Sequence, residues 1–171
     1  MSAPEFSRLA DIRQINAKPE HLVASETECA ALAERFLLVA VKRLEATVAL
    51  EKEGTTVHAR GRMSAEIVQS CAVSGEDLEV SIDEPVTLRF VPATDTARPD
   101  EEIELTEEDL DEIPYAGTQF DLGEAIAQSL ALAIDPYLTG PQAEEARRKA
   151  GLSNETASGP FAALAALKKQ D

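Results

Sequence analysis

The sequence predicts an α+β fold, in which a curved antiparallel sheet forms a barrel-like meander and is packed by two to three helices. Long segments between residues 43 and 90 alternate apolar with polar residues, which is the period of a β-strand. Two other segments, 25–36 and 121–134, begin with helix-capping residues and contain helix-forming ones. Three long strands with short connections expose one apolar face, which a sheet covers with helices or by closing on itself.

Composition indicates one compact domain with an aliphatic core. The chain has 171 residues, of which 44% are hydrophobic but only 4% aromatic, and it contains no tryptophan. It has no run of about 18 apolar residues, and its first residues do not form a signal peptide. We therefore expect a cytoplasmic protein with no membrane partner. The two cysteines, Cys29 and Cys71, fit a reducing compartment.

The N-terminal region leaves two structures open and then predicts a helix. Between residues 6 and 15 an apolar residue recurs at every third position, which fits an edge strand or a short helix. The segment 25–36 predicts a helix, because Ser25 and Glu28 have the spacing of a capping box and alanines follow them.

Two alternating segments, 43–50 and 57–67, predict a β-hairpin. The Glu-Gly dipeptide at 53–54 supplies turn residues between them. We expect Lys52 to pair with Thr55, which places the apolar residues of both segments on one buried face.

The predicted register also fixes the charges on the outer face of the hairpin. It places Glu45 opposite Arg62, which is an attractive cross-strand pair. A slip by one residue would bury Arg60 and Arg62, so the sequence predicts this register to be well specified.

A turn and a third strand follow the hairpin. Residues 71–75 predict the turn, which begins at Cys71. Residues 78–90 predict the strand, with apolar side chains on the even-numbered positions. Pro85 interrupts this strand and indicates an edge position or a bulge.

The segment 100–112 is the most acidic part of the chain. It contains nine acidic residues and no basic one, and it lies within a region, 76–135, that carries a net charge of −16, equal to that of the whole protein. Apolar residues lie among the acids, so we expect a short strand at Ile103–Leu105 and a turn after Thr106 instead of a plain solvated linker.

The segment 121–134 predicts the clearest helix. Asp121 is expected to cap its N-terminus, with Glu124 reaching back as in a capping box. Asp135-Pro136 is expected to end it. An apolar stripe along this helix should pack on the sheet, and it consists of Leu122, Ile126, Leu130, Ala133 and Ile134.

We expect a single domain over residues 1–138 and a polar tail over residues 139–171. Residues 139–160 are mostly polar, with glycine, proline and serine, and predict a flexible segment. The last part, Pro160–Lys169, predicts a short terminal amphipathic helix.

The sequence predicts no catalytic residue, cofactor, metal site or small-molecule substrate. A zinc ribbon needs paired CxxC motifs, whereas Cys71 is followed three positions later by Ser74. Phosphate-binding loops and HExxH motifs are absent from the chain. A nucleophilic cysteine would need His21 or His58 beside it in the fold, so a cysteine-dependent hydrolase using Cys71 stays as a third functional alternative.

The predicted strands place five basic residues on their outward faces. A basic face of this kind contacts RNA through its phosphates. Ordinary surface charge, balanced by Glu45 and Glu66, is the simpler interpretation. The candidate RNA-binding residues are Arg43, His58, Arg60, Arg62 and Arg89.

The acidic segment also has a functional interpretation besides solubility. Closely spaced carboxylates offer a basic partner, such as a ribosomal protein, a charge pattern like that of a phosphate backbone. The candidate partner-binding residues are Asp100, Glu101, Glu102, Glu104, Glu107, Glu108, Asp109, Asp111 and Glu112.

Four stretches of the sequence resemble one known family. They read VQSCAVSGEDLEVSIDEPVTLRFVP, EEIEL, DLGEAIAQSLALAIDPY and PFAALAALK. They resemble the YceD family, the large ribosomal RNA subunit accumulation proteins, and among these the alphaproteobacterial members, which also open with words like MSAPEFSR. Many members have a CxxC motif where this chain has Cys71 and Ser74, so the resemblance implies no metal here.

The resemblance implies a cytoplasmic bacterial protein that is needed for normal accumulation of 23S ribosomal RNA, with no established catalytic residues. Together with the charge pattern, it predicts a non-catalytic accessory factor in large-subunit biogenesis. The expected partner is a ribosomal protein or a pre-50S particle, bound through the acidic surface. The alternative is direct binding of 23S rRNA by the basic outer face of the hairpin.

Overall fold

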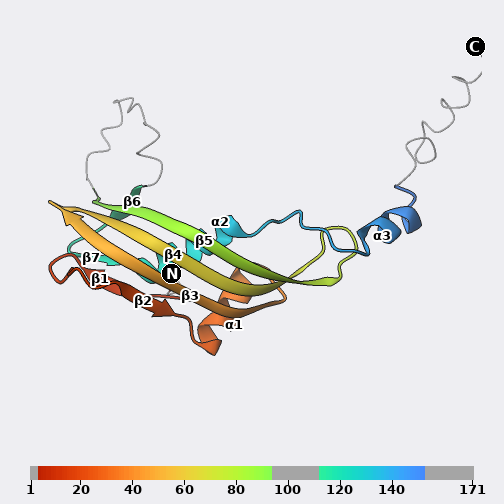
Figure 1. The fold of residues 1–171 in the computed structure, drawn as a ribbon, viewed down its shortest axis with the longest axis horizontal. Helices are drawn as coiled ribbons and strands as arrows, with labels where there is room; N and C mark the ends of the chain where they lie inside the picture. Colours follow the sequence, from red (N-terminus) through yellow and green to blue (C-terminus); the bar gives the residue numbers. More distant parts are fainter. Residues whose placement is uncertain (1–3, 94–111, 153–171) are drawn as a thin grey trace, which may run out of the picture.

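The computed structural model describes residues 4–93 and 112–152. These residues form a five-stranded sheet, a two-stranded sheet and three helices (Figure 1). The elements are, in chain order, β1 (Leu9–Asp11), β2 (Glu20–Val23), α1 (Glu26–Arg35), β3 (Ala40–Glu53), β4 (Thr56–Ser70), β5 (Asp77–Pro92), β6 (Glu112–Tyr115), β7 (Gln119–Asp121), α2 (Leu122–Ala133) and α3 (Ala143–Lys149).

The larger sheet has the strand order β2-β3-β4-β5-β6, and the long strands β3, β4 and β5 curve together across the molecule (Figure 1). Helix α1 packs against β3, and α2 packs against β4 and β5. The predicted α+β class, with helices on a curved sheet, is therefore confirmed. Among the described residues the sheet is open, with β2 and β6 as its two edges.

One strand of the sheet differs from the predicted antiparallel meander. Strand β6 runs parallel to β5, whereas the other neighbouring pairs are antiparallel. A parallel neighbour cannot be joined by a tight hairpin turn, and residues 93–111 form the connection here. The sequence did not predict β6, because this strand is only four residues long and directly follows the acidic segment.

The core lies between the sheet and the two helices, and it is largely aliphatic, as composition predicted. Alternate residues of β3, β4 and β5 point into it, including Leu44, Met63 and Phe90. From α2, the side chains of Ile126 and Leu130 are fully buried. Each such side chain contributes roughly 1.5–3 kcal/mol to stability by leaving water.

The predicted parity of the β3–β4 hairpin is confirmed, but its register is wrong by two residues. Glu53 pairs with Thr56, so the turn consists of Gly54 and Thr55. Gly54 adopts a φ of +62°, a conformation that glycine adopts without steric cost. Alternation with a period of two cannot distinguish registers that differ by two, and the turn geometry decides between them.

The register changes one predicted contact on the outer face. Arg62 lies opposite Thr47, and Glu45 lies opposite Ser64. The predicted cross-strand pair of Glu45 with Arg62 is therefore wrong. Arg62 instead pairs with Asp83 on β5, at 2.5 Å between Nε and Oδ1.

Strand β5 and the turn before it are as predicted. Its pairing with β4 is continuous from Asp77 to Phe90, with no bulge. Strand β6 pairs only with Arg89–Pro92. At Pro85, therefore, no described strand lies beside β5 on the side away from β4. Of the two roles predicted for Pro85, the edge position is the one observed.

Both predicted helices form, and their N-terminal caps differ in one respect. Ser25 and Glu28 form the predicted capping box of α1. Asp121 caps α2 by accepting the N–H of Glu124, but the Glu124 side chain does not reach back. Its carboxylate pairs instead with Arg35 of α1, at 2.7 Å. Among the described residues, no helix combines the length and the apolarity needed to cross a membrane.

The two ends of the described chain add short elements to this framework. Of the two structures left open for residues 6–15, the strand is observed, because β1 pairs with β7. Helix α3 lies in the segment expected to be a flexible tail, and Ala143 at its start is buried. The predicted strand at Ile103–Leu105 and the helix at Pro160–Lys169 lie outside the described residues, and the boundary at residue 138 stays a prediction.

Candidate functional site

The predicted basic face lies where the strands were expected to put it, on the outer side of β3, β4 and β5. Each of its five members has an acidic partner within 4 Å. The pairs are Arg43 with Glu45 and Glu66, His58 with Glu53, Arg60 with Glu51, Arg62 with Asp83, and Arg89 with Glu112. These acids reduce the positive potential that RNA phosphates would meet.

Three of these cations share one shallow hollow, and two do not. The hollow has a volume of about 550 Å³ and includes His58, Arg60 and Arg89. His58 lies directly opposite Arg89 across the β4–β5 pair. The Nε of Arg89 is buried and has no hydrogen-bond partner among the described residues. Arg43 and Arg62 lie outside this hollow.

The acidic surface predicted for 100–112 lies outside the described residues, apart from Glu112. Glu112 begins β6, and its carboxylate is 2.9 Å from Nη1 of Arg89. The structure adds further acids that the sequence analysis had not singled out, along β5 and the turn before it. They are Glu76, Asp77, Glu79, Asp83 and Glu84.

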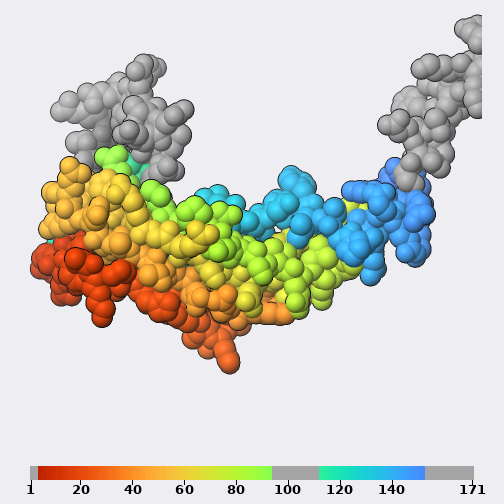
Figure 2. All heavy atoms as spheres, viewed as in Figure 1, coloured from red at the N-terminus to blue at the C-terminus, as the bar shows by residue number. Residues whose placement is uncertain are grey.

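Beside these acids, a groove runs between β5 and α2. Its volume is about 680 Å³, and β5 contributes residues 84–88 to its lining. Ile113 of β6 also lines it, and α2 contributes Gln128 and Leu132. Leu132 is 89% exposed, which is unusual for a large apolar side chain on a helix that packs in the core. Figure 2 shows β5 (green) and α2 (cyan) side by side along the upper margin of the molecule.

The Cys71 side chain is held in the turn between β4 and β5. Its sulfur accepts the N–H groups of Val73 (3.5 Å), Ser74 (3.3 Å) and Gly140 (3.3 Å). Hydrogen bonding by the Ser74 side chain and by these three N–H groups lowers the pKa of the Cys71 thiol to about 6, against the opposing effect of burial. Cys71 therefore anchors Gly140, which precedes α3, to the turn.

The structure does not bring Cys71 next to a histidine. His58 lies near the start of β4, thirteen positions before Cys71 along the strand, a distance of roughly 40 Å. His21 lies on the edge strand β2 and pairs with Thr47, which lies opposite Arg62 of β4, nine positions before Cys71. The Cys–His pair that a hydrolase would need is not formed by these residues. Within the described ranges, no three His, Cys, Asp or Glu side chains are grouped to hold a metal ion.

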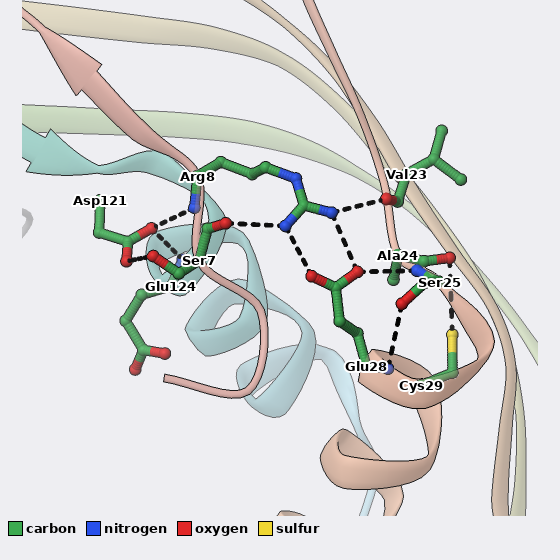
Figure 3. Close-up of polar contacts among 9 residues, drawn as sticks. All are labelled: Ser7, Arg8, Val23, Ala24, Ser25, Glu28, Cys29, Asp121 and Glu124. Carbon is green, nitrogen blue, oxygen red and sulfur yellow. Dashed lines mark hydrogen bonds and ion pairs between the residues drawn. The ribbon is translucent and has the colours of Figure 1, made fainter. Parts of the chain in front are cut away.

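A polar cluster joins the N-terminal segment to both helices (Figure 3). The Arg8 guanidinium donates to both carboxylate oxygens of Glu28, at 2.6 and 2.9 Å, and to the Val23 carbonyl. The Asp121 carboxylate accepts from the Ser7 hydroxyl and from the Arg8 N–H. Every charged group in this cluster is engaged within the protein, so we interpret it as structural.

The hydrogen bonds within this cluster stabilise the charged form of Glu28. The bond from Arg8 and those from Ser25 lower the pKa of Glu28 to about 2, and burial opposes this shift only in part. The sequence revealed the capping role of Glu28 but not its partner Arg8, which lies 20 residues away in the chain.

A family model described as large ribosomal RNA subunit accumulation protein YceD matches residues 59–168. The chain belongs to the YceD family. Among curated proteins and among solved structures, no match was found. The matched region of this YceD chain includes β5, β6 and α2, and so the whole lining of the groove. Membership connects the chain to the accumulation of large-subunit ribosomal RNA, as the family description states.

Sequence reasoning identified the charges of this YceD chain but not their surroundings. It assigned the basic residues to the correct face, yet four of their partners, Glu51, Glu53, Asp83 and Glu112, are revealed only by the register and by β6. The groove depends on the approach of α2 to β5, which lie about 40 residues apart in the sequence. In the sequence, the signal for this groove was Leu132, a large apolar residue outside the apolar stripe of α2.

Proposed function

We propose that this YceD protein supports large-subunit rRNA accumulation as a non-catalytic binding protein that holds a basic ribosomal protein, free or within a pre-50S particle, in the cytoplasm. The observation that carries the proposal is the position of the acids. The acidic sequence between β5 and β6 starts and ends beside the acidic strand β5, at the edge of the sheet.

Charge balance supports a basic partner over a nucleic acid. Residues 76–92 contain five acids and one base, and the protein as a whole has a net charge of −16. A field of this sign accelerates association with cationic proteins and opposes association with phosphates. On the outer face, each candidate cation already lies beside a carboxylate, and these pairs also engage Asp83 and Glu112, so the excess of acids over bases is what favours a basic partner.

A capture experiment with purified large-subunit proteins tests the proposal. In one variant, all nine acids of 100–112 are replaced by their amides. We expect this variant to lose most of the ribosomal proteins that the wild type retains, because the attraction depends on the carboxylate charges. Unchanged capture would show that the acidic segment does not hold the partner.

A smaller pair of variants controls for net charge. Glu107, Glu108 and Asp109 are replaced by amides in one variant. Three exposed acids far from β5, namely Glu20, Glu26 and Glu34, are replaced in the other. Both variants lose three charges, so only a local role of the acidic segment gives weaker capture in the first. In cells that lack the native protein, the ratio of 23S to 16S rRNA should follow the same order.

Direct rRNA binding is the second candidate function, and the hollow around Arg89 favours it. His58, Arg60 and Arg89 line this hollow together, and their side-chain N–H groups are donors of the kind that bind a phosphate. The double variant Arg60→Glu with Arg62→Glu reverses two charges of this face. If its crosslinking to rRNA equals that of the wild type, this candidate is eliminated.

A further inference from the structure

We propose that the open edge of β5 receives an extended, lysine- or arginine-rich segment of the protein partner as an added strand. The inference rests on the proposed function, because it specifies how the basic partner is seated. An added strand obtains its affinity from main-chain hydrogen bonds and its specificity from alternate side chains. Both components can be located on the described surface.

The edge provides a long row of backbone groups. Strand β5 has 16 residues, and β6 pairs with only the last four of them. Along Asp77–Leu88, no other strand in the described part of the chain lies on that side of β5. Unpaired N–H and C=O groups of this kind form a template for another strand.

The residues of β5 whose backbone N–H and C=O groups point away from β4, at the open edge, can be identified. Directly after β5, the N–H of Ala93 donates to the carbonyl of Tyr115, on the β6 side (2.8 Å). Because strand residues alternate in the neighbour they face, the odd-numbered residues of β5 direct their N–H and C=O groups away from β4. Asp83 and Thr87 therefore offer both groups at the open edge, whereas Pro85 offers only a carbonyl.

The groove between β5 and α2 offers contacts for the side chains of the added strand. A strand beside residues 84–88 would project alternate side chains toward α2, where Val86, Leu88 and Ile113 form an apolar surface. Glu84 also lines this groove and can pair with a basic side chain, whereas Glu112 is already paired with Arg89. On the outer face, the other side chains of the added strand would lie beside Asp83, whose carboxylate is already paired with Arg62.

The same charges determine which occupant is accepted. A second copy of this chain would bring its own acidic strand against the first, and like charges on neighbouring strands are destabilising. Acids and a proline on an edge strand are devices that prevent self-association. A basic strand reverses the sign of this interaction, so charge complementarity selects it over a second copy.

The test uses the full chain and a synthetic peptide in which lysine alternates with valine and threonine. Thr87→Pro removes the N–H that the peptide would use, while Thr87→Val keeps that N–H and a β-branched side chain. Thr87 is exposed and its backbone points away from β4, so the proline should be tolerated there as Pro85 is. We expect Thr87→Pro to weaken peptide binding about tenfold and Thr87→Val to leave it nearly unchanged.

Two further measurements keep the result unambiguous. Peptide binding should slow amide hydrogen exchange at Thr87 and Asp83 but not at Leu88, whose N–H faces β4. If Thr87→Pro fails to fold, Leu132→Arg replaces it, because this change adds a positive charge to the groove wall and should also weaken binding. Equal binding by the folded Thr87→Pro variant, or unchanged exchange at Thr87, overturns the inference.

The inference and the proposed function can fail separately. Loss of ribosomal-protein capture on neutralising 100–112, together with normal capture by Thr87→Pro, would leave the function standing and remove β5 as the seat. If the wild type captures no ribosomal protein, the proposed function fails. Binding of the peptide at the β5 edge would then show a strand-binding site whose natural partner is not a ribosomal protein.

Discussion

At the scale of single residues, the pairing of Glu28 with Arg8 makes the stability of the fold depend on acidic pH. The pKa of Glu28 in the folded protein is about 2, below its usual value of 4.5. A lowered pKa contributes stability above the unfolded-state value, and this contribution is lost as pH falls from about 4.5 toward 2. Glu28→Gln removes the titrating group.

We therefore expect the wild type to lose more thermal stability than Glu28→Gln between pH 5 and pH 2. Other carboxylates titrate in the same range, so the difference between the two proteins is the relevant quantity. Thermal unfolding followed by circular dichroism measures it. Parallel pH profiles for the two proteins would contradict the prediction.

Cys71 gives a second prediction at this scale. Its thiol should titrate with a midpoint near 6, because the Ser74 side chain and the three backbone N–H groups stabilise the thiolate. Burial instead raises the pKa of Cys29. The ultraviolet absorbance of the thiolate should therefore rise near pH 6 in the wild type and in Cys29→Ser, but not in Cys71→Ser.

At the scale of the elements, Gly61 controls the approach of β3 to β4. A Cβ atom at this position would lie 2.0 Å from the Thr47 carbonyl oxygen and 2.7 Å from Cα of Val48. Backbone atoms of a central strand cannot move aside without disturbing the sheet. We expect Gly61→Ala to lower the free energy of unfolding by about 2–3 kcal/mol.

Gly54→Ala is the matched control for this prediction. Gly54 has a positive φ but open space around its Cα, so its substitution should cost about 1 kcal/mol from backbone strain alone. Urea unfolding of both variants gives the comparison. If Gly61→Ala were the more stable of the two, the close approach of β3 to β4 would have to be relaxed in solution.

The elements also show how far sequence patterns lead. Long strands and capped helices were predictable, because alternation and capping are local and repeat over many residues. The register of β3 with β4, the parallel pairing of β6 and the docking of α3 near Cys71 were not. They depend on turn geometry and on contacts between residues far apart in the chain, such as the bond from the Gln142 N–H to Glu76.

At the scale of the whole molecule, the charge pattern was fully predictable and its consequences for binding were only partly so. Counting acids identified 100–112 as a candidate partner site, but not the groove beside it. Counting bases identified the outer face, but not that neighbouring carboxylates pair with its members. The sequence contains the charges, whereas their mutual compensation is set by the fold.

Electrostatic capture of a basic protein should weaken with salt. The screening length falls from about 10 Å at 0.1 M salt to about 3 Å at 1 M. We expect ribosomal-protein capture by the wild type to decrease strongly over this range, and the residual capture by the nine-amide variant to change little. Salt-independent capture would indicate that apolar contacts hold the partner.

The parallel pairing of β6 with β5 leaves the intervening chain far longer than the sheet requires. Since Glu112 lies opposite Arg89, the chain has to return along only three residues of β5, roughly 10 Å. The nineteen residues 93–111 can span about 60 Å when extended. Because the cost of closing a loop rises only slowly with its length, insertions and deletions there should be tolerated by the fold. The length and the number of acids in this connection can therefore change to suit the partner without disturbing the pairing of β5 with β6.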